Sequence, residues 1–149
     1  MRAVVQRVSS ASVTVDGNVV GKINNGFLVL MGVCMEDTEK DLDYIYKKVV
    51  GLRVFQDEND QMNLGLEDVG GELLVISQFT LYGDARKGRR PSFIQAARPE
   101  QANKLYEEFI AKAEADGIKC EKGIFGADMK VELVNDGPVT ILLDSTKML

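Results

Sequence analysis

The sequence is 149 residues long, which is the length of one domain, and its 45% hydrophobic content is sufficient for a sizeable core. It contains no histidine, which excludes Ser-His-Asp and Cys-His catalysis, imidazole acid–base chemistry and His-ligated zinc. Its 18 basic and 23 acidic residues give a net charge of −5, which argues against general electrostatic binding of nucleic acid, and we expect no DNA partner.

The first residues and the two cysteines bear on the cellular compartment. Residues 1–8 alternate apolar and polar side chains with charges among them, which is typical of a strand and not of a signal peptide. No apolar run approaches the roughly 18–20 residues that a membrane span requires, so no membrane partner is expected. Cys34 and Cys120 occur without an export signal, which indicates reduced thiols rather than a disulfide. We expect a cytoplasmic protein.

Strand patterns occupy both ends of the sequence and its centre. A first strand covers residues 3–8 and resumes at 13–15. Asp16-Gly17 then predicts a hairpin turn, because glycine tolerates the positive φ of such turns. The nearly continuous apolar residues at 26–33 indicate a strand that is covered on both faces. The remaining predicted strands are residues 19–23, 72–78, 129–133 and 139–143.

Two helices are predicted between these groups of strands. Thr38 can cap the first helix, with Asp41 three residues later, and apolar residues recur at helical spacing through Leu52. The second helix begins near Pro99, which suits a first helical turn, and ends at Gly117. This order of elements predicts an α/β protein of the α+β type, in which helices pack on a mixed, barrel-like β-sheet in a single domain.

Four of the 18 basic residues fall within one five-residue stretch. Arg86, Lys87, Arg89 and Arg90 leave the rest of the chain with 14 basic and 23 acidic residues, a net charge of −9. Such a stretch is either a small phosphate-contacting patch on an acidic body or a solvated loop. Composition alone leaves both interpretations open.

Two further segments carry polar residues in unusual places. The strand at 72–78 runs into Ser77-Gln78-Phe79-Thr80-Leu81, and polar groups at a strand end can meet a ligand while the sheet holds them rigidly. The alternative is that the two hydroxyls simply cap the strand backbone. Asn135-Asp136-Gly137-Pro138-Val139-Thr140 lies between two predicted strands. It predicts a turn that contains either an ordinary trans Gly-Pro bond or a cis bond with two carbonyl oxygens on one side.

These motifs resemble those of the D-aminoacyl-tRNA deacylases, formerly called D-tyrosyl-tRNA deacylases. The resemblance extends over the whole chain, and the motifs occur in the family's order and spacing without a departure at the motif positions. The segments that carry it are residues 1–8 with Ala11, Val13 and Val15, residues 77–81, residues 87–92 and residues 135–140.

The resemblance implies a cytoplasmic homodimer that hydrolyses the ester between a D-amino acid and the 3′-terminal adenosine of tRNA. This reaction recycles the tRNA and keeps D-residues out of translation. The implied subunit is a β-barrel flanked by helices, with its active site at the homodimer interface. The residues then expected to line the aminoacyl-adenosine pocket are Ser77, Gln78, Phe79 and Thr80.

The same resemblance assigns the second motif to chiral selection. Gly137 and Pro138 are expected to form a cis pair that enters the partner subunit's site, where their carbonyl groups crowd the position of an L side chain. D side chains then point outward, and glycyl-tRNA also becomes a substrate. Arg7 is expected to hold the pair, and Met129 to border the pocket. The residues expected to contact tRNA phosphates are Arg86, Lys87, Arg89 and Arg90.

The implied chemistry agrees with the residues that the sequence offers. An aminoacyl ester is already activated, so its hydrolysis depends on positioning and oxyanion stabilisation more than on a strong nucleophile. Backbone N–H groups near Phe79 and Thr80 are candidates for the oxyanion site. The Thr80 hydroxyl has no histidine to activate it, so assistance by the ribose 2′-hydroxyl of the substrate is the favoured hypothesis. No cofactor and no metal are expected.

Two alternatives remain open from the sequence. One is a non-catalytic RNA-binding module in which the basic stretch binds RNA and both motifs are structural turns. The other is a hydrolase of small esters or N-acyl amino acids on the same fold. Turnover distinguishes the first alternative, and a requirement for the tRNA and its 2′-hydroxyl distinguishes the second.

Overall fold

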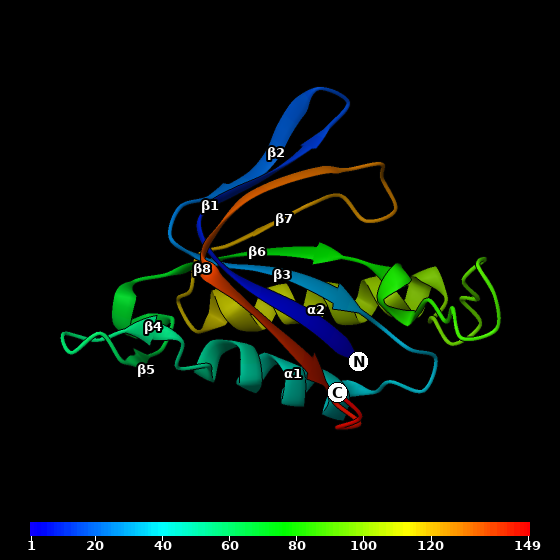
Figure 1. Ribbon diagram of the computed structural model, residues 1–149. Coiled ribbons are helices and arrows are strands. Elements are labelled where there is room, and N and C mark those ends of the chain that lie inside the picture. Colours follow the sequence, from blue (N-terminus) through cyan, green and yellow to red (C-terminus); the bar gives the residue numbers. More distant parts are fainter.

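The fold is built on its first strand. A computed structural model describes residues 1–149, and in it β1 (Arg2–Val15) turns at Asp16-Gly17 into β2 (Asn18–Ile23) (Figure 1). The φ angles of the two turn residues are 49° and 80°, so the predicted hairpin turn is confirmed. β3 (Gly26–Gly32) then pairs antiparallel with the first half of β1.

Six strands form one sheet that curls into a nearly closed barrel. The strand order is β2-β1-β3-β6-β7, and β8 (Lys130–Asp144) pairs with β1. β6 (Glu72–Ser77) runs parallel to β3, and β7 (Cys120–Lys122) runs parallel to β6. Because β2 also contacts β6 and β7, the sheet almost closes on itself (Figure 1). The predicted mixed, barrel-like sheet of an α+β domain is therefore confirmed.

Two helices pack along one side of this sheet (Figure 1). α1 (Glu39–Gly51) begins as predicted, because the Thr38 hydroxyl accepts from the Lys40 N–H and the Asp41 carboxylate accepts from the Thr38 N–H. α2 (Pro99–Ala115) has its proline in the first turn, where the missing N–H has no helical acceptor to lose. Neither helix has the length and the apolar character that a membrane crossing requires.

The sheet separates two buried apolar clusters. The larger cluster lies between the sheet and the helices and includes Phe27, Tyr106 and Phe109, none more than 2% exposed. The smaller cluster lies inside the curl of the sheet. Its members come from β1, β2, β3 and β6: Val8, Ala11, Val13, Ile23, Leu28, Leu74 and Ile76. Both faces of β3 and β6 are thus covered, as their nearly continuous apolar sequences require.

β8 corrects one prediction. The two strands predicted at 129–133 and 139–143 are parts of one strand, which begins at Lys130, and both parts pair antiparallel with β1. Val8 pairs with Asn135 and Gln6 with Thr140, so residues 136–139 bulge out opposite Arg7. The same turn-forming residues suit a hairpin and a bulge equally, and the unbroken β1 alongside selects the bulge.

Several short elements were not predicted, because they are too brief to produce a periodic pattern. A two-stranded sheet and two short 3₁₀ helices lie in the connections between the longer elements. They are β4 (Phe55–Gln56), β5 (Met62–Leu64), η1 (Glu67–Val69) and η2 (Phe79–Tyr82). The helix η2 begins two residues after the end of β6.

Candidate active site

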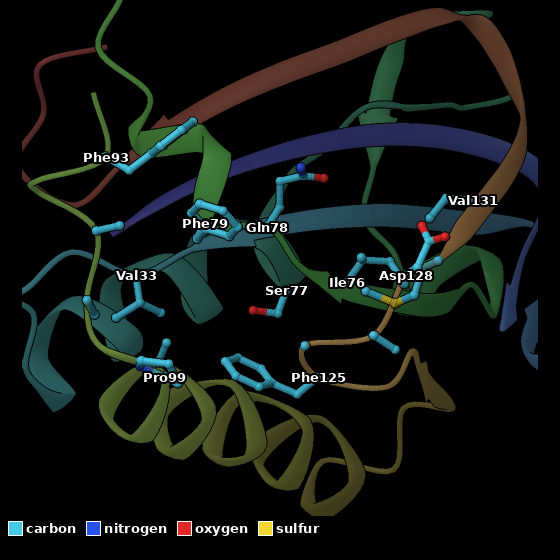
Figure 2. A pocket seen from close by; sticks show the side chains of 16 residues that line it. Val33, Ile76, Ser77, Gln78, Phe79, Phe93, Pro99, Phe125, Asp128 and Val131 are labelled. Atoms are coloured by element: carbon cyan, nitrogen blue, oxygen red, sulfur yellow. The ribbon is translucent and has the colours of Figure 1, made fainter. Parts of the chain in front are cut away.

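A cavity of about 590 Å³ opens between the end of β6, the N-terminal part of α2 and the segment that leads into β8 (Figure 2). Its wall is mainly apolar and contains a single charged side chain, that of Asp128. The lining residues from the strand ends and η2 are Val33, Ile76, Ser77, Gln78 and Phe79. The other lining residues are Phe93, Ala96, Ala97, Pro99, Ala102, Phe125, residues 126–129 and Val131.

The end of β6 places three of the predicted site residues at this cavity. The Gln78 N–H donates to the Met31 carbonyl at 2.8 Å, which continues the β3–β6 pairing just past Ser77. Figure 2 shows the Ser77 side chain directed into the open space and the Phe79 ring on its rim. A Cβ at Gly32 would lie 2.9 Å from the Leu81 Cβ, so glycine is needed there for η2 to pack on β3.

Thr80 lies next to the cavity rather than in its wall. It is exposed, and its hydroxyl accepts a hydrogen bond from the Gln78 side-chain amide at 2.5 Å. An amide donor cannot remove a proton from a hydroxyl, so this contact orients the Thr80 oxygen without making it a stronger nucleophile. Of the four residues expected to line the aminoacyl-adenosine pocket, Ser77, Gln78 and Phe79 line this cavity and Thr80 does not. Their role toward a substrate stays a prediction.

The cavity also contains residues that the sequence did not single out. Met129, which was expected at the border of the pocket, lines the cavity. Phe93, Phe125 and Pro99 also line it, although none of them was expected there. They come from two loops and the first turn of α2, so no local motif connects them to Ser77. No pattern in the sequence marks these residues as part of the site.

The second motif contains the bulge of β8, defined here as residues 136–139. The Arg7 guanidinium connects this bulge to the rest of the protein. Its Nε donates a hydrogen bond to the Asp136 carbonyl at 2.8 Å. One terminal nitrogen donates to the Val54 carbonyl at 2.6 Å and to the Gln56 side chain at 2.7 Å. Arg7 is only 5% exposed. A buried guanidinium with three oxygen acceptors fixes the position of all three.

The far side of the bulge is closed by Asn135. Its side-chain oxygen accepts from the Val139 N–H at 2.8 Å, and its amide donates to the Val139 carbonyl at 3.2 Å. Gly137 has φ +147°, and the Gly137–Pro138 peptide bond is cis. Gly137 and Pro138 are exposed and are not among the residues that line the cavity of their own chain.

The basic segment, residues 86–90, is an exposed loop outside the cavity. Arg86 makes a two-point contact with Asp84, at 2.9 Å and 2.7 Å, and these hydrogen bonds lower the pKa of the Asp84 carboxyl to about 2. Lys87, Arg89 and Arg90 form no ion pair. Three of the four predicted phosphate contacts are therefore free cations.

The two thiols lie away from the cavity. Neither Cys34 nor Cys120 lines it, and the two thiols are free. Burial raises the pKa of the Cys120 thiol to about 12, so this sulfur is protonated at neutral pH. No group of three or more His, Cys, Asp or Glu side chains in the chain is arranged to hold a metal ion.

Comparison with known proteins agrees on one family. The family model described as D-Tyr-tRNA(Tyr) deacylase matches residues 4–144. A D-aminoacyl-tRNA deacylase of Clostridioides difficile (strain 630) is 65% identical over 147 residues, which are 99% of this chain and 99% of that protein. Proteins of the same name from Koribacter versatilis (strain Ellin345) and Thermosipho africanus (strain TCF52B) are 62% and 58% identical, again over 99% of each chain.

Solved structures share the whole fold. The structure titled "c-Myc DNA Unwinding Element Binding Protein" is 42% identical, covers 97% of this chain and 98% of its own, and superposes with a TM-score of 0.91. A second, titled "Structural Analysis of a probable eukaryotic D-amino acid tRNA deacylase", has a TM-score of 0.84 at 18% identity and covers 96% and 98%. The second likeness bears on the fold alone.

Proposed function

The chain belongs to the family of D-aminoacyl-tRNA deacylases, and from this premise we propose that it hydrolyses the ester between a D-amino acid and the 3′-terminal adenosine of tRNA. Members of this family are hydrolases. The proposed reaction requires a site that binds an aminoacyl ester of adenosine. The observation that carries the proposal is the cavity at the end of β6, where Ser77, Gln78 and Phe79 line an apolar space of about 590 Å³. That volume falls in the range of small-ligand sites.

Hydrolysis in this site proceeds by attack of water on the ester carbonyl. Thr80 is not the nucleophile, because its only side-chain partner is the Gln78 amide, which cannot accept a proton. The backbone N–H groups of Phe79 and Thr80, at the start of η2, stabilise the developing oxyanion. One such donor contributes about 10²–10³-fold in rate. The 2′-hydroxyl of the terminal ribose assists the water, so the substrate supplies the group that the protein lacks.

Chirality is decided by exclusion in a homodimer. Gly137 and Pro138 are exposed on a bulge that the buried Arg7 holds, and they lie outside their own chain's cavity. We assign them to the partner's cavity, where their carbonyl groups occupy the position that the side chain of an L-aminoacyl ester would need. A clash of this kind rejects L-substrates without requiring contact with the D side chain. Different D-residues are then accepted, and glycyl-tRNA is accepted as well.

The phosphates of the tRNA are bound by the positive charges of the basic segment. Lys87, Arg89 and Arg90 are exposed and unpaired next to the segment that carries Phe93 into the cavity wall. Contacts between these cations and phosphates add affinity without reading the base sequence. A surface of this type suits an enzyme that meets many tRNAs.

The test is the parallel hydrolysis of D-tyrosyl-tRNA and L-tyrosyl-tRNA by the purified chain with a chelator present. The proposal predicts rapid loss of the D-ester alone, and strongly reduced loss when the terminal adenosine lacks its 2′-hydroxyl. Loss of both esters would retain a hydrolase but exclude chiral rejection. If neither ester is cleaved faster than in buffer, including with metal ions restored, the activity is refuted and RNA binding without turnover takes its place.

A further inference from the structure

One aromatic side chain near the cavity is held rigidly and yet remains open to solvent. Phe93 is 39% exposed, and its ring meets that of Phe79, itself 56% exposed, edge-on with centroids 5.1 Å apart. Figure 2 shows the two rings side by side at one end of the cavity. The two residues come from separate segments, and together they form an apolar surface that extends from the cavity to the solvent.

The backbone on both sides of Phe93 is fixed. Asp84 and Ser92 exchange two hydrogen bonds, with N–H to carbonyl distances of 2.8 Å and 2.9 Å. The Gln95 carbonyl accepts from the Met35 N–H at 3.0 Å, which ties the following residues to the end of β3. A Cβ on Gly83 would lie 3.0 Å from the edge of the Phe93 ring, so the ring packs into space that only glycine leaves. An exposed ring with this support is preorganised for a ligand.

The charge around this ring indicates what the ligand is. The bridge between Asp84 and Ser92 closes the loop that carries the basic segment, so the cations of Lys87, Arg89 and Arg90 belong to the same loop whose base presents Phe93. A partly exposed aromatic ring on the same loop as unpaired cations is a combination that binds single-stranded nucleic acid, because bases stack on the ring while phosphates contact the cations. An apolar peptide would use the ring but not the cations.

We propose that Phe93 stacks on the nucleotide that precedes the terminal adenosine, and so guides the single-stranded 3′ end of the tRNA from the basic segment into the cavity. The inference rests on the proposed function, since it takes an aminoacyl-adenosine in the cavity as its starting point. Phe93 is a positioning residue in this scheme: it orients the strand and does not touch the ester. Its exposed neighbour Ile94 does not line the cavity and provides a matched control.

The experiment compares two substrates, full D-tyrosyl-tRNA and the D-tyrosyl ester of adenosine alone, with wild type, Phe93→Ala, Phe93→Leu, Phe93→Tyr and Ile94→Ala. Loss of the stacking of one base on an aromatic ring lowers the affinity for the strand on the order of tenfold or more. We expect the ratio of kcat/KM for the tRNA to that for the adenosine ester to fall by about this factor in Phe93→Ala and Phe93→Leu, through KM. Phe93→Tyr should restore the ratio, and Ile94→Ala should leave it unchanged.

The outcomes separate this inference from the function it rests on. An equal loss on both substrates would make Phe93 a cavity wall only, and no loss on either would remove it from binding; both results overturn the inference. If the wild type cleaves neither ester, the proposed function itself fails. Phe93→Leu retains apolar bulk, so it reports on stacking even where Phe93→Ala lowers the melting temperature.

Discussion

The bulge of β8 and the basic segment are both exposed, but the protein holds them in opposite ways. The bulge stands on the buried guanidinium of Arg7, which donates to three oxygens within 2.8 Å, and Asn135 closes its other side. The basic segment is tied at its base by the Asp84–Ser92 bridge and by the ion pair of Arg86, whose side chain is 82% exposed. Its other cations have no protein partner.

The difference suits the two kinds of recognition that we propose. A wall that rejects one enantiomer by steric clash must hold its position to a fraction of an ångström, and buried hydrogen bonds provide that rigidity. Phosphate contacts act through long side chains and long-range charge, so they tolerate motion. Substitutions at the bulge should therefore change the D-to-L ratio, and substitutions in the basic segment should change KM and its dependence on salt.

Loss of Arg7 should have the largest effect. Arg7→Met removes the charged donor from the buried Val54 carbonyl and from the partly buried Asp136 carbonyl, and we expect the free energy of unfolding to fall by about 3 kcal/mol or more. The D-to-L ratio should fall with it, since the bulge loses its support. Urea unfolding and paired deacylation assays measure both quantities. Arg98→Met, at an exposed position, is the control and should change stability by less than about 0.5 kcal/mol. Wild-type stability in Arg7→Met would contradict the role of Arg7.

Gly137→Ala should act more locally. The new Cβ would lie 2.7 Å from Val139 Cγ2 and 2.9 Å from the Val139 nitrogen, at a φ of +147° that disfavours alanine, so the bulge backbone must move. Displacement of this size should lower the ratio of D- to L-tyrosyl-tRNA hydrolysis by about 100-fold. Gly51→Ala, where a Cβ meets open space, is the matched control. An unchanged ratio in a folded Gly137→Ala protein would refute selection by this bulge.

Charge reversal in the basic segment should change tRNA binding without changing selection. We expect Lys87→Glu, Arg89→Glu and Arg90→Glu together to raise KM for D-tyrosyl-tRNA on the order of 10- to 100-fold at low salt. The slope of log KM against log salt should flatten by about 2. The control reverses three exposed helix lysines, which makes the same change in net charge: Lys40, Lys47 and Lys104. An equal effect of both triple variants would show that only net charge matters.

The smallest effect on tRNA binding is expected from loss of the Arg86–Asp84 ion pair at the base of the basic segment. The hydrogen bonds from Arg86 lower the pKa of Asp84 to about 2, so the pair is intact above that pH and is lost only as the pH falls through 2. We expect the Asp84 carboxyl to titrate near 2 by NMR in the wild type and nearer its usual range in Arg86→Ala. KM for tRNA should rise less in Arg86→Ala than in Arg90→Ala, because Arg86 is already neutralised. Titration of the wild-type carboxyl near 4 would contradict this account.

The sequence predicted the elements that local chemistry determines. The capping box at Thr38, the proline that opens α2 and the Asp16-Gly17 turn each specify their conformation within a few residues, and all three are confirmed. The bulge of β8 was mistaken for a turn between two strands, because its residues suit both and the pairing with β1 lies more than a hundred residues away in the sequence.

The residues of the candidate site also fall into those that a local sequence feature indicates and those that only tertiary packing brings together. Residues 77–81 were singled out because polar groups follow a strand end, and only the family resemblance gave residues 77–80 a role at the site. Phe93, Pro99 and Phe125 were missed, since their approach to Ser77 depends on how α2 and two loops pack on the sheet. The resemblance placed Gly137 and Pro138 in the partner's site, and their position outside their own chain's cavity is compatible with that expectation.

The central claim is that the bulge of one subunit guards the cavity of the other, and mixed dimers test it most directly. One chain carries Gly137→Ala and so accepts L-esters; the other carries Ala127→Trp, which fills the cavity wall and abolishes turnover. With the second chain in large excess, every intact cavity faces an intact bulge from its partner. The account predicts that hydrolysis of L-tyrosyl-tRNA disappears while hydrolysis of D-tyrosyl-tRNA persists. L-ester hydrolysis that survives in the mixed dimer would show that each bulge serves its own chain.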